Sequence, residues 1–101
     1  MDLGLAAKVR PAVVLSIPAD DTDRALVTII PHTTSVRGSR FEAAVSVAFL
    51  RVGVFDAQNI VTIPHAKLVR VLGKLSAAQL AIVARATIVW LGISGITSPE
   101  V

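Results

Sequence analysis

The sequence predicts a mainly β protein, a small antiparallel barrel that carries one helix at its C-terminal end. Two observations predict this architecture. Short runs rich in β-branched residues, separated by turn residues, fill residues 11–75, and the apolar residues then change to helical spacing over residues 76–93. Because the strands come first and do not alternate with helices, this order favours an antiparallel barrel over a parallel sheet with crossover helices.

Length and composition indicate one small domain. The chain has 101 residues, and we expect the domain to span residues 1–93 and a flexible tail to follow over residues 94–101. The residues are 53% hydrophobic but only 4% aromatic, so Val, Ile, Leu and Ala must form the core. The absence of cysteine excludes disulfides and thiolate metal sites. Residues 76–93 are short for a bilayer span and no signal peptide is recognisable, so we expect a cytoplasmic protein.

The predicted strands follow from composition and turn residues. Residues 11–17 and 25–31 are the first two strands, and the Pro- and Asp-rich residues between them form a turn. Residues 32–41 are polar and basic and should form an exposed loop. Further strands are predicted at residues 42–50, 54–63 and 67–75. The second of these should break near residues 56–59, and Gly73 in the third is a candidate bulge.

The helix is predicted to begin at Ser76. The stretch from Ser76 to Gln79 is a capping box, in which each polar side chain accepts a free N–H of the first turn. Apolar residues follow at helical spacing as far as Leu91, and Gly92 suits the left-handed position that ends a helix.

Several catalytic motifs are missing from the sequence. It has no Gly-rich phosphate loop before a helix, no paired histidines at helical spacing and no serine elbow. Asp20, Asp21 and Asp23 gather in one turn, where a solvated turn is the simpler interpretation and a metal site the alternative. His32 and His65 are far apart in the sequence, and each alone fits a histidine at the surface or at the edge of the core.

A phosphate-binding set is predicted where the first hairpin opens. The net charge of +3 permits an anionic partner. If residues 11–17 and 25–31 pair, Arg10 lies at the same open end as residues 31–34. A guanidinium beside hydroxyls suits a phosphate, since Arg offers two parallel donors and Thr or Ser adds a third. The alternative is an ordinary loop whose Ser and Thr side chains cap its turns.

Three motifs together resemble a known family. They are the Arg10-Pro11 pair before a β-branched strand, the Pro-x-Thr-Thr strand end at residues 31–34, and the Gly-x-Leu-Ser-x-x-x-Leu start of the helix at residues 73–80. In order and spacing they are similar to the motifs of the MazF/PemK family of toxin–antitoxin ribonucleases, over residues 2–92.

The resemblance implies an SH3-like small β-barrel, a homodimer and a cognate antitoxin whose disordered tail binds across the toxin. It also implies a sequence-specific endoribonuclease that cuts single-stranded mRNA and needs neither metal nor cofactor. The family's catalytic arginine corresponds to Arg10 and its catalytic threonine to Thr33. Cleavage would proceed by attack of the ribose 2′-OH on the adjacent phosphate.

Further residues are expected to assist this pair. His32 is the nearest titratable candidate for catalytic proton transfer, although on a strand its side chain points away from that of Thr33. Basic and hydroxyl side chains nearby are expected to bind the RNA: Lys8, Thr34, Ser35, Arg37 and Arg40.

The chain departs from the family pattern at several points. The family's first strand corresponds here only to residues 1–4, so we expect that strand to be missing or truncated. The loop before Arg10-Pro11, at residues 4–9, lacks an acid found in many members, and Asn59-Ile60-Val61-Thr62 lacks an arginine common in the family. Two other functions stay open: a non-catalytic toxin of the same barrel type, like the CcdB family that binds DNA gyrase, and an inactive homologue that still binds an antitoxin.

Overall fold

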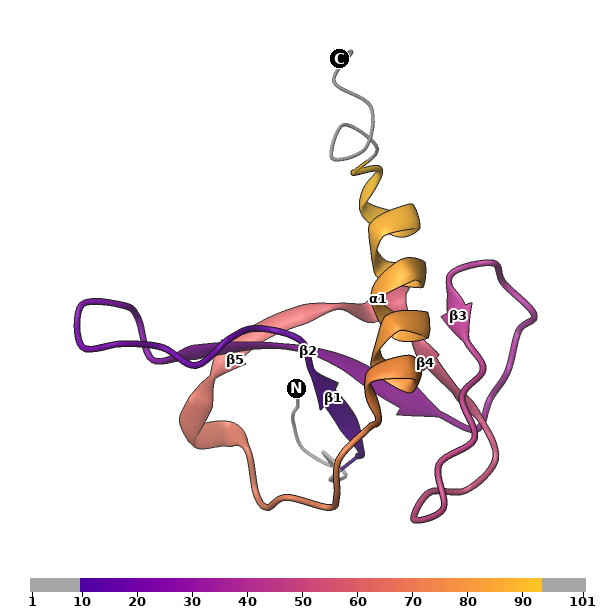
Figure 1. The fold of residues 1–101 in the computed structure, drawn as a ribbon, viewed down its shortest axis with the longest axis horizontal. Helices are drawn as coiled ribbons and strands as arrows, with labels where there is room; N and C mark the ends of the chain where they lie inside the picture. Colours follow the sequence, from indigo (N-terminus) through magenta and orange to yellow (C-terminus); the bar gives the residue numbers. More distant parts are fainter. Residues whose placement is uncertain (1–9, 94–101) are drawn as a thin grey trace.

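The computed structural model describes residues 10–93, in which an antiparallel sheet curls into half a barrel and one helix lies against it (Figure 1). The elements are β1 (Ala12–Val14), β2 (Leu26–Thr33), β3 (Glu42–Ala43), β4 (Val54–Asp56), the 3₁₀ turn η1 (Ala57–Asn59), β5 (Val61–Pro64), the 3₁₀ turn η2 (His65–Lys67) and α1 (Ala77–Leu91). The predicted class, mainly β with a C-terminal helix, is confirmed. The predicted truncated first strand and C-terminal tail lie outside the described residues.

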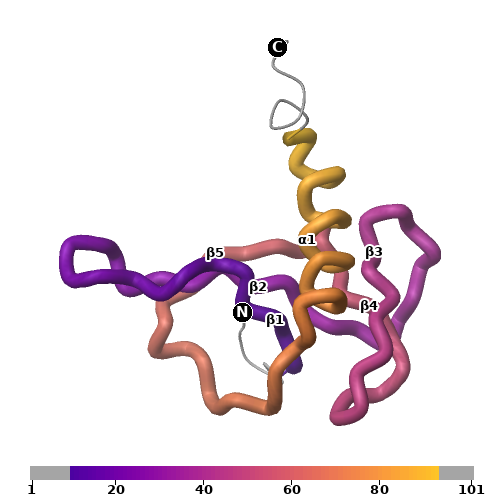
Figure 2. The backbone as a smooth tube through the Cα atoms, viewed as in Figure 1, coloured from indigo at the N-terminus to yellow at the C-terminus, as the bar shows by residue number. Residues whose placement is uncertain are grey.

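β2 is the centre of the sheet, with β1 along one edge and both β4 and β5 along the other (Figure 2). β1 pairs antiparallel with β2 and places Ala12 opposite Pro31, which confirms the predicted hairpin. β5 and β4 follow one another along the second edge, and their registers against β2 differ by three residues. The three residues of η1 take up this difference, which confirms the predicted break near residues 56–59.

β2 continues beyond the predicted strand and includes His32 and Thr33, so the prediction that these two residues begin a loop is wrong. Partners on both edges keep this end extended. The His32 N–H donates to the carbonyl of Pro11 at 2.9 Å on one side. On the other side His32 and Thr33 lie opposite Phe55 and Val54 of β4. The polar end of β2 is therefore part of the sheet, and the exposed loop begins at Thr34.

The strand predicted at residues 42–50 is mostly absent. Only Glu42 and Ala43 join a ladder, while Val45 and Val47 alternate into the core without strand pairing. Their alternation reflects burial alone, because a strand also needs a neighbour that supplies hydrogen bonds.

The strand predicted at residues 67–75 is wrong, because residues 68–75 have no regular structure. Gly73 is not a bulge. A Cβ at this position would lie 2.5 Å from the ring of Phe49, so glycine permits a close approach between two loops. A β-branched composition favours a strand only where a partner is available.

The core lies between one face of the sheet and α1. Ile30 of β2 and Val83 of α1 are completely buried at its centre. The other buried members of this cluster are Ala43, Val45, Val47, Phe55, Ala57 and Ala86. Because side chains alternate along a strand, Ile30 and His32 point to this core and Thr33 points to the opposite face of β2.

Helix α1 begins and ends as predicted. Ser76 Oγ accepts the N–H of Gln79 at 3.1 Å, and the Gln79 side chain accepts the N–H of Ser76 at 2.8 Å. The Gln79 amide also donates to the carbonyl of Ser46 at 2.9 Å, which ties the helix start to the core segment. Gly92 ends the helix with φ at 69°. Within residues 10–93, no helix is both long and apolar enough to span a bilayer.

Candidate functional site

The pairing of β1 with β2 brings Arg10 and Thr33 to the same end of the hairpin. Ala12 lies opposite Pro31, and the hydrogen bond from His32 N–H to Pro11 continues the pairing by one more residue. Arg10 comes directly before Pro11 and Thr33 directly after His32, so both lie at the same end of the hairpin. The prediction that Arg10 shares an open end with residues 31–34 is confirmed.

The hydroxyl of Thr33 is held by the turn that follows β2. The Ser35 N–H donates to Thr33 Oγ1 at 3.0 Å. Because the oxygen acts as an acceptor in this bond, its own O–H stays available to donate to a bound phosphate or ribose. Thr34 and Ser35 are exposed beside it. The strand end thus offers one oriented hydroxyl with two further polar residues nearby.

His32 is not placed for proton transfer beside Thr33. Its side chain is only 5% exposed, and its ring meets that of Phe55 edge to face with 5.1 Å between ring centres. Burial lowers the pKa of His32, which favours the neutral imidazole. The predicted catalytic role of His32 therefore needs correction: strand alternation directs the ring into the core, and the residue supports the strand end by packing.

Gly53 is a feature of the site that the sequence analysis missed. A Cβ on this residue would lie 2.3 Å from the carbonyl oxygen of Thr33 and 2.9 Å from Cε1 of His32. The chain leading into β4 can therefore lie against the end of β2 only because residue 53 has no side chain. The only signal in the sequence was a glycine directly before the strand predicted at residues 54–63.

The arginine loop, residues 34–41, is organised by Glu42, which the sequence analysis placed in a strand. The Glu42 carboxylate accepts the N–H groups of Arg37, Gly38 and Ser39 at 3.0, 2.8 and 3.1 Å. These bonds lower the pKa of Glu42, and the bond from the Arg37 N–H contributes most. Gly38 adopts φ of 81°, which permits the sharp turn that directs three successive N–H groups to one carboxylate.

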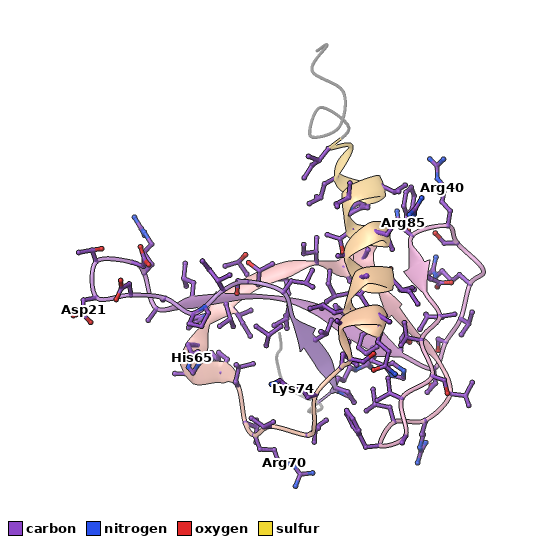
Figure 3. The ribbon with its side chains drawn as sticks, viewed as in Figure 1. Asp21, Arg40, His65, Arg70, Lys74 and Arg85 are labelled. Atoms are coloured by element: carbon purple, nitrogen blue, oxygen red, sulfur yellow. The ribbon has the colours of Figure 1, made fainter. Side chains whose placement is uncertain are left out.

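The arginine loop is also fixed at its C-terminal end. The guanidinium of Arg40 lies 4.6 Å from the ring centre of Phe41, and that ring meets Trp90 of α1 edge to face at 5.0 Å. Arg40 and Arg85 of α1 line one shallow groove of about 230 Å³ and lie near each other in Figure 3. Arg37 and Arg40 are both exposed, as binding to RNA would require.

Two other predictions concern residues away from this site. The turn that contains Asp20, Asp21 and Asp23 lies at the tip of the β1–β2 hairpin, where Figure 3 labels Asp21. The Asp20 N–H donates to Asp23 Oδ2 at 2.9 Å and the Asp21 N–H to Asp20 Oδ1 at 3.0 Å, which are the bonds of an ordinary turn. Nowhere in residues 10–93 do three His, Asp or Glu side chains gather as metal ligands. Lys8, predicted to bind RNA, lies outside the described residues.

Comparison with known proteins shows which family the chain resembles. Residues 4–91 match the PemK-like, MazF-like toxins of type II toxin–antitoxin systems. The Mycobacterium tuberculosis toxin MazF-mt6 is similar in structure, with 33% sequence identity, a TM-score of 0.70 and coverage of 82% of this chain and 86% of that chain. No curated protein sequence matches the chain.

Two further solved structures are similar. An endoribonuclease from a Mycobacterial species has 25% identity and a TM-score of 0.70, with coverage of 82% of this chain and 80% of that chain. The MazE–MazF structure from Deinococcus radiodurans has 28% identity and a TM-score of 0.71, with coverage of 84% and 87%.

The half-barrel with its single C-terminal helix is a MazF-like fold. The family match spans most of the chain, so the chain belongs to the PemK/MazF toxin family of type II toxin–antitoxin systems. The resemblance drawn from the Arg-Pro and Pro-x-Thr-Thr motifs is confirmed.

Proposed function

We propose that this chain is a sequence-specific endoribonuclease toxin that cleaves single-stranded mRNA in the cytoplasm. The observation that carries the proposal is the β1–β2 pairing, which brings Arg10 and Thr33 to the same open end of the hairpin. Similarity to an endoribonuclease from a Mycobacterial species supports it. The exposed Arg37 and Arg40 lie on the loop that follows Thr33 and supply charge for flanking phosphates.

The proposed reaction uses the substrate's own nucleophile. The ribose 2′-OH loses its proton and attacks the adjacent phosphorus, a 2′-O–P bond forms, and the P–O5′ bond breaks. The products are a 2′,3′-cyclic phosphate and a 5′-OH whose oxygen gains a proton. Arg10 stabilises the charge that develops on the non-bridging oxygens, and the Thr33 hydroxyl orients the phosphate or the 2′-OH. In this scheme no metal or cofactor takes part. Lys8, Thr34 and Ser35 complete the proposed RNA contacts.

An RNA oligonucleotide with a single 2′-deoxy substitution at the scissile position should resist cleavage and still bind, because only the nucleophile has been removed. Cleavage of the all-ribose control should be unchanged in EDTA. The measurement is gel analysis of end-labelled oligonucleotides with the purified protein. Cleavage of the substituted oligonucleotide, or loss of activity in the chelator, would reject the metal-free 2′-OH mechanism. Growth arrest on expression, without RNA cleavage by the pure protein, would favour the non-catalytic toxin.

The proposed functional unit is a homodimer, and the exposed side of α1 supports this proposal. α1 carries two apolar stripes. One includes Val83 and Ala86 and is buried on the sheet. The second recurs at helical spacing and is mostly exposed: Ala77, Leu80, Ala81, Ala84, Ile88 and Leu91. A helix that is apolar on two sides is usually covered on both.

Ile88→Glu should therefore weaken dimerisation by on the order of tenfold or more, as expected for a charge placed at the centre of an apolar interface. Ile82→Glu is the matched control, because Ile82 is equally apolar and exposed but lies off the second stripe. Sedimentation equilibrium of the three proteins measures the change. If Ile88→Glu associates like the wild type, this side of α1 is not the dimer interface.

A cognate antitoxin is the second proposed partner. The similar Deinococcus radiodurans structure is a MazE–MazF complex. The excess of ten Lys and Arg over seven Asp and Glu suits an acidic binding partner.

A further inference from the structure

We propose that Glu42 is a positioning residue for RNA binding: its carboxylate fixes residues 37–39 of the arginine loop, so that Arg37 is held ready for a phosphate that flanks the cleavage site. The inference rests on the proposed function, and it assigns a role to an acid on a surface where positive charge would be expected.

Three bonds to one carboxylate are the basis of the proposal. The N–H groups of Arg37, Gly38 and Ser39 are consecutive in the chain and all donate to Glu42, at distances of 2.8–3.1 Å. Successive N–H groups that converge in this way form a concave site for an anion. Here the anion is tethered in the same chain, next to the loop that it organises. The backbone on both sides of Gly38 is thereby fixed.

The C-terminal end of the loop is held independently by Ser39 and Phe41, so Glu42 controls only residues 37–39. The N–H of Phe41 donates to Ser39 Oγ at 3.0 Å, and the N–H of Glu42 donates to the Ser39 carbonyl at 3.1 Å. Phe41 is held in turn by the ring of Trp90. Loss of the Glu42 carboxylate should therefore release residues 37–39 and leave the sheet and the packing of Phe41 on Trp90 in place.

The charges around Glu42 explain why an acid is tolerated there. Arg37 faces it from the loop, Arg40 and Arg85 of α1 line the same groove, and Asp56 of β4 is its cross-strand neighbour. The Asp56 carboxylate is occupied by the N–H of Gln58 and the amide of Asn59. Donors therefore satisfy the hydrogen bonds of both carboxylates, and Arg37 offsets part of the charge of Glu42.

The first test needs no RNA. In the wild type the amide proton shifts of Arg37, Gly38 and Ser39 should titrate together with the Glu42 carboxylate. Its pKa is lowered, so the loop bonds are complete at neutral pH and are lost only as the pH falls through a value below that of an ordinary glutamate. In Glu42→Gln these shifts should not titrate, and in Asp56→Asn they should titrate as in the wild type. If the amide shifts of these three residues in Glu42→Gln are the same as in the wild type over the whole titration, the proposal is overturned.

The second test measures RNA binding with the uncleavable 2′-deoxy oligonucleotide. Glu42→Gln should raise its Kd by about tenfold, the size expected when one hydrogen bond to a charged group is removed. It should also lower the salt dependence of log K by about 0.7, the contribution of the one phosphate that Arg37 no longer neutralises. A variant that is merely less folded would lose active protein without a change in this slope. Cleavage at saturating RNA should stay within about twofold of the wild type, because Arg10 and Thr33 are untouched.

Asp56→Asn is the matched control, since it neutralises the neighbouring acid without removing a loop bond. The proposal is overturned if Asp56→Asn weakens binding as much as Glu42→Gln, or if Glu42→Gln binds like the wild type. Failure of the wild type to bind or cleave any RNA would instead reject the proposed function. In that case the amide titration still decides whether Glu42 fixes the loop.

Discussion

Arg10→Ala should lower RNA cleavage by about 10²–10³-fold, the usual loss when one donor to a developing oxyanion is removed. Arg10 lies at the exposed end of the β1–β2 hairpin, outside the core, so the free energy of unfolding should barely change. Arg10→Lys should restore little activity, because a lysine supplies a point charge and not the two parallel donors of a guanidinium. Single-turnover cleavage of one oligonucleotide by each variant measures the effect.

Arg24→Ala is the control for this experiment. Arg24 is also exposed, but it lies near the turn of the same hairpin, at the end away from Thr33. The Arg24→Ala substitution removes one positive charge from the same hairpin. It should leave the cleavage rate within about twofold of the wild type, as for most surface substitutions. Equal cleavage by the wild type and Arg10→Ala would reject Arg10 as the residue that stabilises the transition state.

Gly53→Ala should damage both stability and activity, because the added Cβ would lie 2.3 Å from the backbone oxygen of Thr33. A backbone atom cannot move aside as a flexible side chain can, so the contact between β2 and β4 must open. We expect a loss of about 1–3 kcal/mol in the free energy of unfolding, as for other overpacked sites. Displacement of Thr33 by about 1 Å would lower cleavage by roughly 10²-fold. Urea unfolding and single-turnover cleavage measure the two effects.

Gly73→Ala is the control that separates the loss of stability from the loss of cleavage. Its added Cβ would lie 2.5 Å from the ring of Phe49, a half-exposed side chain that can move aside, so it should destabilise the fold less and at a contact that does not involve Thr33. Cleavage per folded molecule should therefore stay near the wild-type value. If both variants lose activity in proportion to stability, Gly53 has no specific role at the end of β2.

Structure that depends on near neighbours was predictable from the sequence. The capping box from Ser76 to Gln79 joins residues three apart, and its bonds form as expected. The turn at Asp20–Asp23 is equally local, and once it is placed the hairpin must bring Arg10 beside the end of β2. The Glu42 bonds also reach only three to five residues, so a signal existed in Gly38 and a following acid. Alternating apolar residues in 42–50 concealed it, because they favoured a strand.

What depends on distant partners was decided by the tertiary structure. The apolar residues 67–75 resemble a strand in composition but have no partner strand, and so they form none. His32 and Thr33 resemble a loop but remain in β2, because β4 supplies a ladder for them. The close approach of Gly53 to Thr33 arises from the same pairing. Sequence by itself determined which residues could turn, cap a helix or bind a phosphate. Only the folded chain decided which segments are paired, since ladder bonds and close contacts require a particular neighbour and not only a suitable composition.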